Sequence, residues 1–137
     1  MSEYALSYTG AEVNELLSTV DEVADYIIAE GTSGMWYWRK WASGVAECWC
    51  KKSISVSGVS TAWGSWYYHE KVEIGSFPFA FMEMPSVVVF NESGTEGVIM
   101  NGGDCSATSA PSVYIARPGT FGVTSYIVGV IAKGRWK

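Results

Sequence analysis

Side chains suited to acid–base or nucleophilic chemistry are few in this chain. His69 is the only histidine, so any serine or cysteine nucleophile would depend on it alone for activation. Glu70 is a poor partner for it in a strand, because adjacent strand residues point to opposite faces, so we expect a solvated or singly hydrogen-bonded histidine. The other carboxylates considered are Glu47, Glu73 and Glu83, and no spacing selects a pair for glycoside hydrolysis. The sequence predicts no enzymatic activity and no catalytic residue.

Phosphate and metal sites have equally little support. Gly102, Gly103 and Asp104 lack the strand–loop–helix context of a phosphate loop. Calcium prefers oxygen ligands, and the candidates are Asn91, Glu92, Asn101 and Asp104, but their spacing matches no calcium loop. We therefore predict no cofactor and no metal.

The cysteines are three, an odd number: Cys48, Cys50 and Cys105. Cys48 and Cys50 would share one face of a strand, with their Cα atoms near the upper limit for a disulfide. A zinc site would need two further ligands. We expect free thiols that serve as small, mostly buried apolar side chains.

An aromatic stretch is the most suggestive binding feature. Trp63, Trp66, Tyr67 and Tyr68 lie within seven positions between two strand patterns. Displayed on a loop, these rings could stack on sugar rings, and Asn101 and Asp104 could accept hydrogen bonds from sugar hydroxyls. The alternative is that the rings close one end of the core or lie in a subunit interface.

Composition excludes several classes of protein. The 137 residues are 48% hydrophobic, 15% aromatic and 17% charged, which is too apolar for disorder. The net charge of −5 is uneven: Met1–Trp38 holds seven acidic residues and no basic one, and the rest is about +2. No basic patch indicates nucleic acid. No continuous apolar run predicts membrane insertion, and no signal peptide is recognised, so we expect synthesis in a cytoplasm.

One amphipathic helix is expected at residues 10–30. Thr9 and Glu12 fit a capping box at its start, and Gly31 offers a stop before a linker at residues 32–34. Its apolar positions repeat every 3.5 residues and are Val13, Leu16, Val20, Val23 and Ile27. This stripe favours self-association; the alternative is a helix that lies on its own domain.

Short alternating runs predict strands over the remainder. Met35–Trp41 and Val45–Lys51 should form a hairpin, and the continuously apolar Pro85–Phe90 a central strand buried on both faces. Further strands are expected at Ser53–Ser60, Val98–Met100, Ser112–Arg117 and Ser125–Lys133. The predicted fold is mainly β: an antiparallel β-sandwich tip domain at residues 35–137, preceded by one α-helix and linker at residues 1–34 that form a coiled-coil-like stem.

Several stretches resemble the C-terminal domains of bacteriophage and prophage tail fibres. Residues 40–50 resemble the family's opening Lys-x-x-Ser-Gly-x-x-x-x-Trp-Gly, with Cys50 in place of the last glycine. Phe77–Phe81, followed by Pro85-Ser86-Val87, resembles its Phe-Pro-x-x-Phe segment and Pro-x-Val strand. Ser125–Lys137 is similar to its closing strand, and Tyr8–Val13 to helix starts in related tail proteins.

The resemblance implies a homotrimeric fibre with a helical stem and a β-sandwich tip that contacts the bacterial surface, often its glycans. The expected function is therefore that of a tail-fibre-like virion protein that attaches to a host-surface glycan or protein. It transfers no specific receptor residue. The alternatives are a purely structural fibre or baseplate component, or a stand-alone carbohydrate-binding module.

Overall fold

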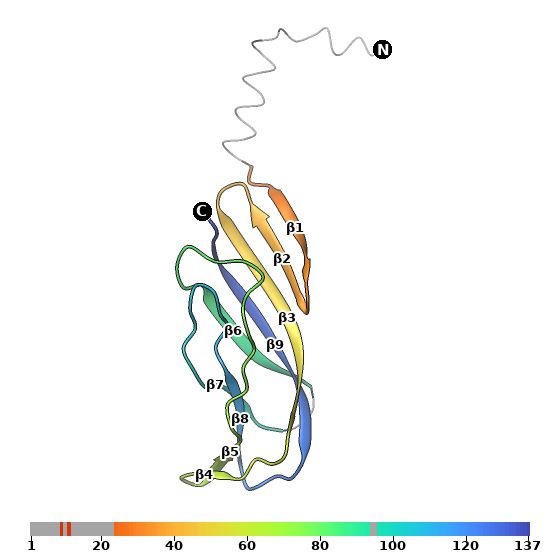
Figure 1. Cartoon of the computed structure of the whole chain (residues 1–137), viewed down its shortest axis with the longest axis vertical. Helices are drawn as coiled ribbons and strands as arrows, with labels where there is room; N and C mark the ends of the chain where they lie inside the picture. Colours follow the sequence, from red (N-terminus) through yellow and green to blue (C-terminus); the bar gives the residue numbers. More distant parts are fainter. Residues whose placement is uncertain (1–8, 10, 12–23, 94–95) are drawn as a thin grey trace.

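The structure, a computed structural model, describes residues 9, 11, 24–93 and 96–137 (Figure 1). The strands in this part are β1 (Ile27–Ser33), β2 (Trp36–Trp41), β3 (Val45–Val56), β4 (Thr61–Trp63), β5 (Trp66–Tyr68), β6 (Ser86–Ser93), β7 (Val98–Asn101), β8 (Val113–Pro118) and β9 (Thr124–Arg135). They form a five-stranded antiparallel sheet, β1-β2-β3-β9-β6, and a four-stranded one, β4-β5-β8-β7. The described part is thus mainly β as predicted, and two antiparallel sheets are consistent with the predicted sandwich.

The two longest strands, β3 and β9, run along the long axis of the molecule and pair over their whole lengths, from Val45 opposite Arg135 to Val56 opposite Thr124 (Figure 1). The β4–β5 hairpin lies at one end of that axis. The start of β1 and the C-terminus lie toward the other end (Figure 1). The chain therefore presents β4 and β5 far from the segment that precedes β1.

The inner faces of the sheets meet in one hydrophobic core. Alternate residues of β3 and β9 are buried there, as the two-residue period of a strand requires. The segment between β5 and β6 adds aromatic rings: Phe77 meets Trp36 edge-on at 5.6 Å and Phe81 at 5.2 Å between ring centroids. The main buried residues are Ala46, Cys48, Cys50, Ile54, Val113, Ile115, Tyr126, Val128, Val130 and Ala132.

The predicted β2–β3 hairpin is confirmed. The prediction of free, mostly buried thiols is confirmed as well. Cys48 and Cys50 are free and buried on the core face, and Cys105 is free and half-buried. Burial raises the pKa of Cys48 to about 12 and that of Cys50 to about 11. These thiols therefore remain protonated at neutral pH and behave as apolar side chains.

The turn of this hairpin anchors the C-terminus. Gly44 has φ +101°, and a Cβ atom there would lie 2.5 Å from Nη2 of Arg135, so a glycine is required on two counts. Arg135 donates a hydrogen bond to the carbonyl of Ser43 at 2.7 Å, and the Trp136 backbone N–H donates to the carbonyl of Gly44 at 2.9 Å. The Ser-Gly pair and the closing strand are thus one structural unit.

The predicted end of the N-terminal helix is wrong. Residues 27–33 form β1, which pairs with β2, so Ile27 is a strand residue and not a heptad position, and residues 32–33 are no linker. Strand pairing with β2 satisfies the backbone groups of this segment, and tertiary pairing overrides local helical periodicity. Val13, Leu16, Val20 and Val23, and most of the predicted helix, lie outside the described residues.

The predicted central strand is also wrong in its position. Pro85–Phe90 corresponds to β6, which is an edge strand, and Val88 is 59% exposed. Val87 and Val89 pack on the core, whereas Phe90 covers Gly129 of β9 on the outer face. The run is continuously apolar because both faces of this edge strand pack against other residues, one face against the core and the other against β9.

Candidate functional site

The outer face of the four-stranded sheet is apolar and aromatic. Val113 and Ile115 point into the core, so Tyr114 and Ala116 point outward from β8. Cross-strand pairs share a face, and Ala116 pairs with both Tyr68 and Val98. By the same register this surface, named here the aromatic face, consists of Trp63, Trp66, Tyr68, Val98, Met100, Tyr114 and Ala116.

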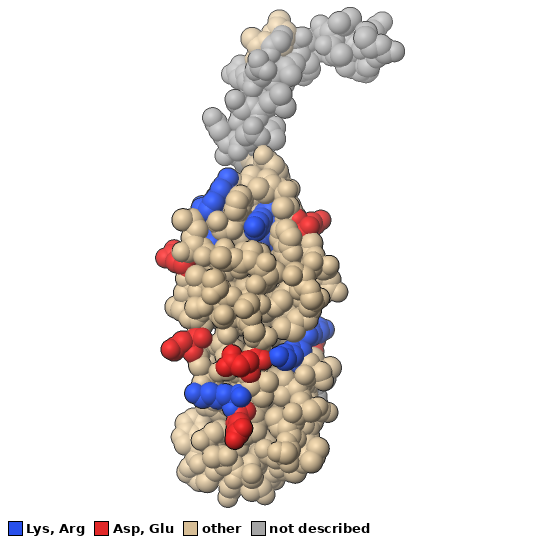
Figure 2. Space-filling view, in the orientation of Figure 1, with Lys and Arg blue, Asp and Glu red and all other residues tan. Residues whose placement is uncertain are grey.

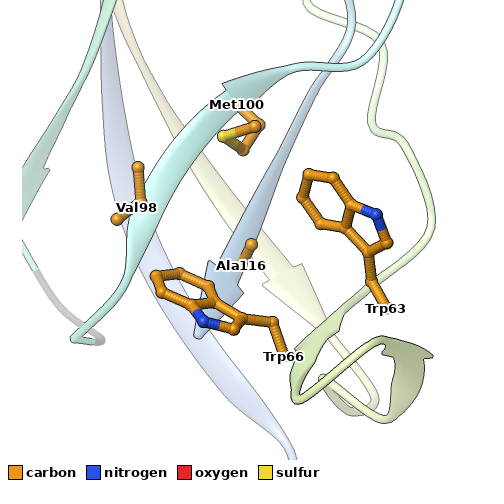
Figure 3. A pocket seen from close by; sticks show the side chains of 5 residues that line it. All are labelled: Trp63, Trp66, Val98, Met100 and Ala116. Carbon is orange, nitrogen blue, oxygen red and sulfur yellow. The ribbon is translucent and has the colours of Figure 1, made fainter. Parts of the chain in front are cut away.

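A pocket of about 330 Å³ opens on the aromatic face (Figure 3). Its lining residues are Trp63, Trp66, Val98, Met100 and Ala116. The two indoles stand on the β4–β5 hairpin, and Trp63 and Trp66 are 54% and 36% exposed. Ala116 is 1% exposed and forms the floor between the indoles and the β7 side chains (Figure 3). A small residue at the floor keeps the space between the larger side chains open.

A two-residue turn places the indoles. Trp63 pairs directly with Trp66, and Gly64 between them has φ +61°, a conformation that other L residues adopt rarely. A loop that displays the rings was one of the interpretations of this segment, whereas the structure shows a hairpin. The missed signal is Gly64-Ser65 between two aromatic runs, since glycine at the first position of a two-residue connection is typical of hairpins.

A second pocket of about 250 Å³ adjoins the first and shares Trp66, Val98 and Ala116 with it. Glu96 and Arg117 also line this second pocket, so it offers charged groups beside the apolar one. The Arg117 guanidinium lies 4.4 Å from the centroid of the Phe121 ring. Its Nε is buried and makes no hydrogen bond within the described part of the chain. A ligand that extends out of the first pocket therefore meets a cation and a carboxylate.

The other predicted binding residues are not gathered at this pocket. Tyr68 lies on the aromatic face, where its ring is 5.3 Å from that of Tyr114. Tyr67 faces the other way and packs against the core. Asn101 and Asp104 line neither of the two pockets. Sequence reasoning found the two tryptophans and missed Val98, Met100 and Ala116, whose approach depends on the strand order β5-β8-β7.

On one side of the molecule, charged side chains of the described residues are absent from the end that carries the hairpin (Figure 2). On the side shown in Figure 2, acidic and basic side chains lie along the body of the domain, and the lowest part, around β4 and β5, is uncharged. Uncharged aromatic surface is easily desolvated, because no ion has to lose its hydration.

His69 is buried and fully hydrogen-bonded, in contrast to the expected solvated or singly bonded histidine. The backbone N–H of Ile115 donates to Nε2 at 2.9 Å, so Nε2 carries the lone pair and Nδ1 the proton. Nδ1 donates to the carbonyl of Glu70 at 2.6 Å, and the hydroxyl of Tyr126 lies 2.7 Å from Nε2 and donates to it. Burial raises the pKa of Tyr126 to about 12, so the hydroxyl keeps its proton. His69 borders a polar groove of about 430 Å³, but both its ring nitrogens are engaged inside the fold.

The described residues show neither a metal cluster nor a membrane-spanning helix. They contain no group of three or more histidine, cysteine, aspartate or glutamate side chains arranged to hold a metal ion. None of their helices has the length and apolar character required to cross a membrane.

No family model matches the chain, and no curated protein and no solved structure matches it significantly. The geometry of the aromatic face and the family resemblance of the sequence are therefore the two grounds for a function.

Proposed function

We propose that this chain is the tip of a phage or prophage tail-fibre-like virion protein, and that the aromatic face attaches the particle to a glycan or protein on the bacterial surface. The observation that carries the proposal is the pocket between Trp63 and Trp66, at the end of the domain far from the segment that precedes β1. Such a placement suits a fibre whose stem precedes the tip in sequence.

The chemistry of the pocket suits a sugar ring. One face of a pyranose presents mainly C–H groups, which pack against indole without loss of hydrogen bonds. Trp63 and Trp66 offer two such surfaces around an apolar floor, and the adjoining charged groups can bind hydroxyls or an ionic substituent. A protein receptor would use the same rings as anchors, because tryptophan dominates binding hot spots.

The test is binding of the labelled full-length chain to intact host cells and to isolated surface polysaccharide. Trp63→Ala and Trp66→Ala should each weaken binding by about 2 kcal/mol, which is roughly a 30-fold rise in Kd. Tyr26→Ala is the matched control, because Tyr26 is 52% exposed and its carbonyl accepts from the backbone N–H of Ala42 in the β2–β3 turn, at the other end of the domain (Figure 1). Its binding should equal that of the unmodified chain.

Two outcomes would redirect the proposal. If both tryptophan variants bind as the unmodified chain does, the receptor site is elsewhere on the domain. If the unmodified chain binds neither cells nor polysaccharide from any candidate host, a structural role in the virion is the better account.

A further inference from the structure

The outer face of the five-stranded sheet also carries exposed apolar side chains, and they form one line across it. Tyr37 pairs with Trp49, Trp49 with Ile131, and Ile131 with Val88, so the four lie side by side on β2, β3, β9 and β6. Tyr37 is 53% and Ile131 44% exposed. The Tyr37 and Trp49 rings stack at 6.0 Å. We name these four residues the apolar row.

A row of alternating charges lies two residues along the strands. Glu30 pairs with Arg39, Arg39 with Glu47, and Glu47 with Lys133, which gives the order minus, plus, minus, plus across β1, β2, β3 and β9. Glu30 and Arg39 form an ion pair at 3.3 Å, and Arg39 lies 5.3 Å from the Trp49 ring. These contacts hold the charged side chains over the sheet. We name these four residues the charged row.

The charged row is complementary to a second copy of itself over all four of its strands. A two-fold axis parallel to the strands, between β2 and β3, reverses the order of the strands and keeps each row at its own level. Glu30 then faces Lys133 of the second copy, and Arg39 faces its Glu47, so all four contacts join opposite charges. A two-fold axis across the strands would instead bring each charge opposite its own copy.

We infer that a second copy of this chain docks on this sheet face, with its strands parallel to those of the first and the two related by that two-fold axis. The same rotation brings Tyr37 opposite Trp49 of the second copy and Ile131 opposite its Thr32, whereas Val88 lies outside the overlap. The overlap covers four strands about 4.8 Å apart over about seven residues of 3.3 Å, or roughly 900 Å² for two flat faces. Side chains make the two surfaces uneven, which raises the buried area toward the ~1,000 Å² that a specific interface needs. An interface of this size fits a dimer that forms only at high protein concentration.

This inference goes beyond the proposed function and does not depend on it. The aromatic face lies on the opposite sheet, so the two copies would expose their tryptophan pockets outward and at the same end of the pair. Two pockets held in that way would bind a repetitive surface with avidity. The three-fold assembly implied by the family resemblance is an alternative to this dimer, and the mass of the assembly in solution distinguishes the two.

The test is sedimentation equilibrium of the full chain and of two charge variants, up to the highest soluble concentration. The positive variant carries Glu30→Lys and Glu47→Lys, and the negative variant Arg39→Glu and Lys133→Glu. The unmodified chain should form a species of twice 14.9 kDa that weakens at high salt. Each variant alone should be a monomer, because all facing charges repel, and an equimolar mixture should restore the dimer.

Several results would overturn the inference: a monomer at every concentration, a mass three times that of the chain, or dimers of either charge variant alone. Circular dichroism checks that the variants fold. If a charge variant does not fold, the single Tyr37→Lys variant replaces it, since it places a cation beside the two-fold axis, opposite the apolar Trp49 of the second copy. That variant should be monomeric, and an unchanged dimer would refute the interface. Cell binding by monomeric variants with intact pockets separates this result from the proposed function.

Discussion

Replacement of His69 by alanine should destabilise the domain severely. His69 has no role in the proposed binding site. The ring links three elements: it accepts from Ile115 of β8 and Tyr126 of β9 and donates to the carbonyl of Glu70. His69→Ala leaves the Ile115 N–H and the Tyr126 hydroxyl buried without a partner. Each orphaned group costs roughly 1–3 kcal/mol, so the total is about 4 kcal/mol, a large part of a typical domain stability.

A double-mutant cycle isolates this network. Tyr126→Phe alone should cost only about 1 kcal/mol, because His69 still accepts from Ile115 and no donor is left unpaired. In the Tyr126→Phe background His69→Ala should cost about 2 kcal/mol less than in the unmodified chain, since one orphaned group is absent. Urea unfolding at pH 7 measures all four species. Equal costs of His69→Ala in both backgrounds would refute the shared acceptor.

Two further predictions concern stability. The free energy of unfolding should fall as the pH rises above about 9. The reason is that thiols in the unfolded chain ionise near pH 9, whereas in the folded chain the pKa of Cys48 is about 12 and that of Cys50 about 11. The slope is about 1.4 kcal/mol per pH unit for each thiol. A Cys48→Ala, Cys50→Ala variant should show a flatter profile between pH 9 and 11 in urea titrations, and an unchanged profile would contradict the assignment. Gly129→Ala should lower the free energy of unfolding by about 1–3 kcal/mol, because the new Cβ would overlap the Phe90 ring. In a Phe90→Ala background the same substitution should cost much less. Equal costs in both backgrounds would exclude this clash.

The first hairpin was predictable because several local signals agree there. Small turn residues at Ala42–Gly44 separate two alternating runs, and Cys48 and Cys50, predicted to share one face, lie on the face that the sheet buries. The long strand β3 was predicted as two strands, Val45–Lys51 and Ser53–Ser60, the second from its alternation of serine with apolar residues. The local sequence pattern therefore predicted the strands, and only the pairing with β9 shows that the two predicted strands are one.

Strand order could not be predicted in the same way. The run Val87–Phe90 has the composition of a central strand, yet it lies at the edge of the sheet, next to β9. This position is set by the pairing of the strands and not by the composition of the run. Residues 27–30 fit a helical period, but β2 offers them a full ladder of backbone hydrogen bonds. Both errors arise where long-range pairing, which local sequence does not encode, decides the outcome.

The candidate site was predictable in part. Trp63 and Trp66 stand out by residue type, and they do line a pocket. Their apolar companions come from β7 and β8, more than thirty positions along the chain, and Asn101 and Asp104 lie outside it. A single sequence identifies conspicuous rings, but the groups that meet them are set by the strand order of the sheet.

The most direct test of receptor binding through the aromatic face is nuclear magnetic resonance of the indole N–H groups during titration with host surface polysaccharide. The seven tryptophans give separate signals, which single Trp→Phe variants assign. The account predicts saturable shifts of Trp63 and Trp66, with the signal of the half-buried Trp136 unchanged. Saturable shifts confined to other tryptophans would contradict it.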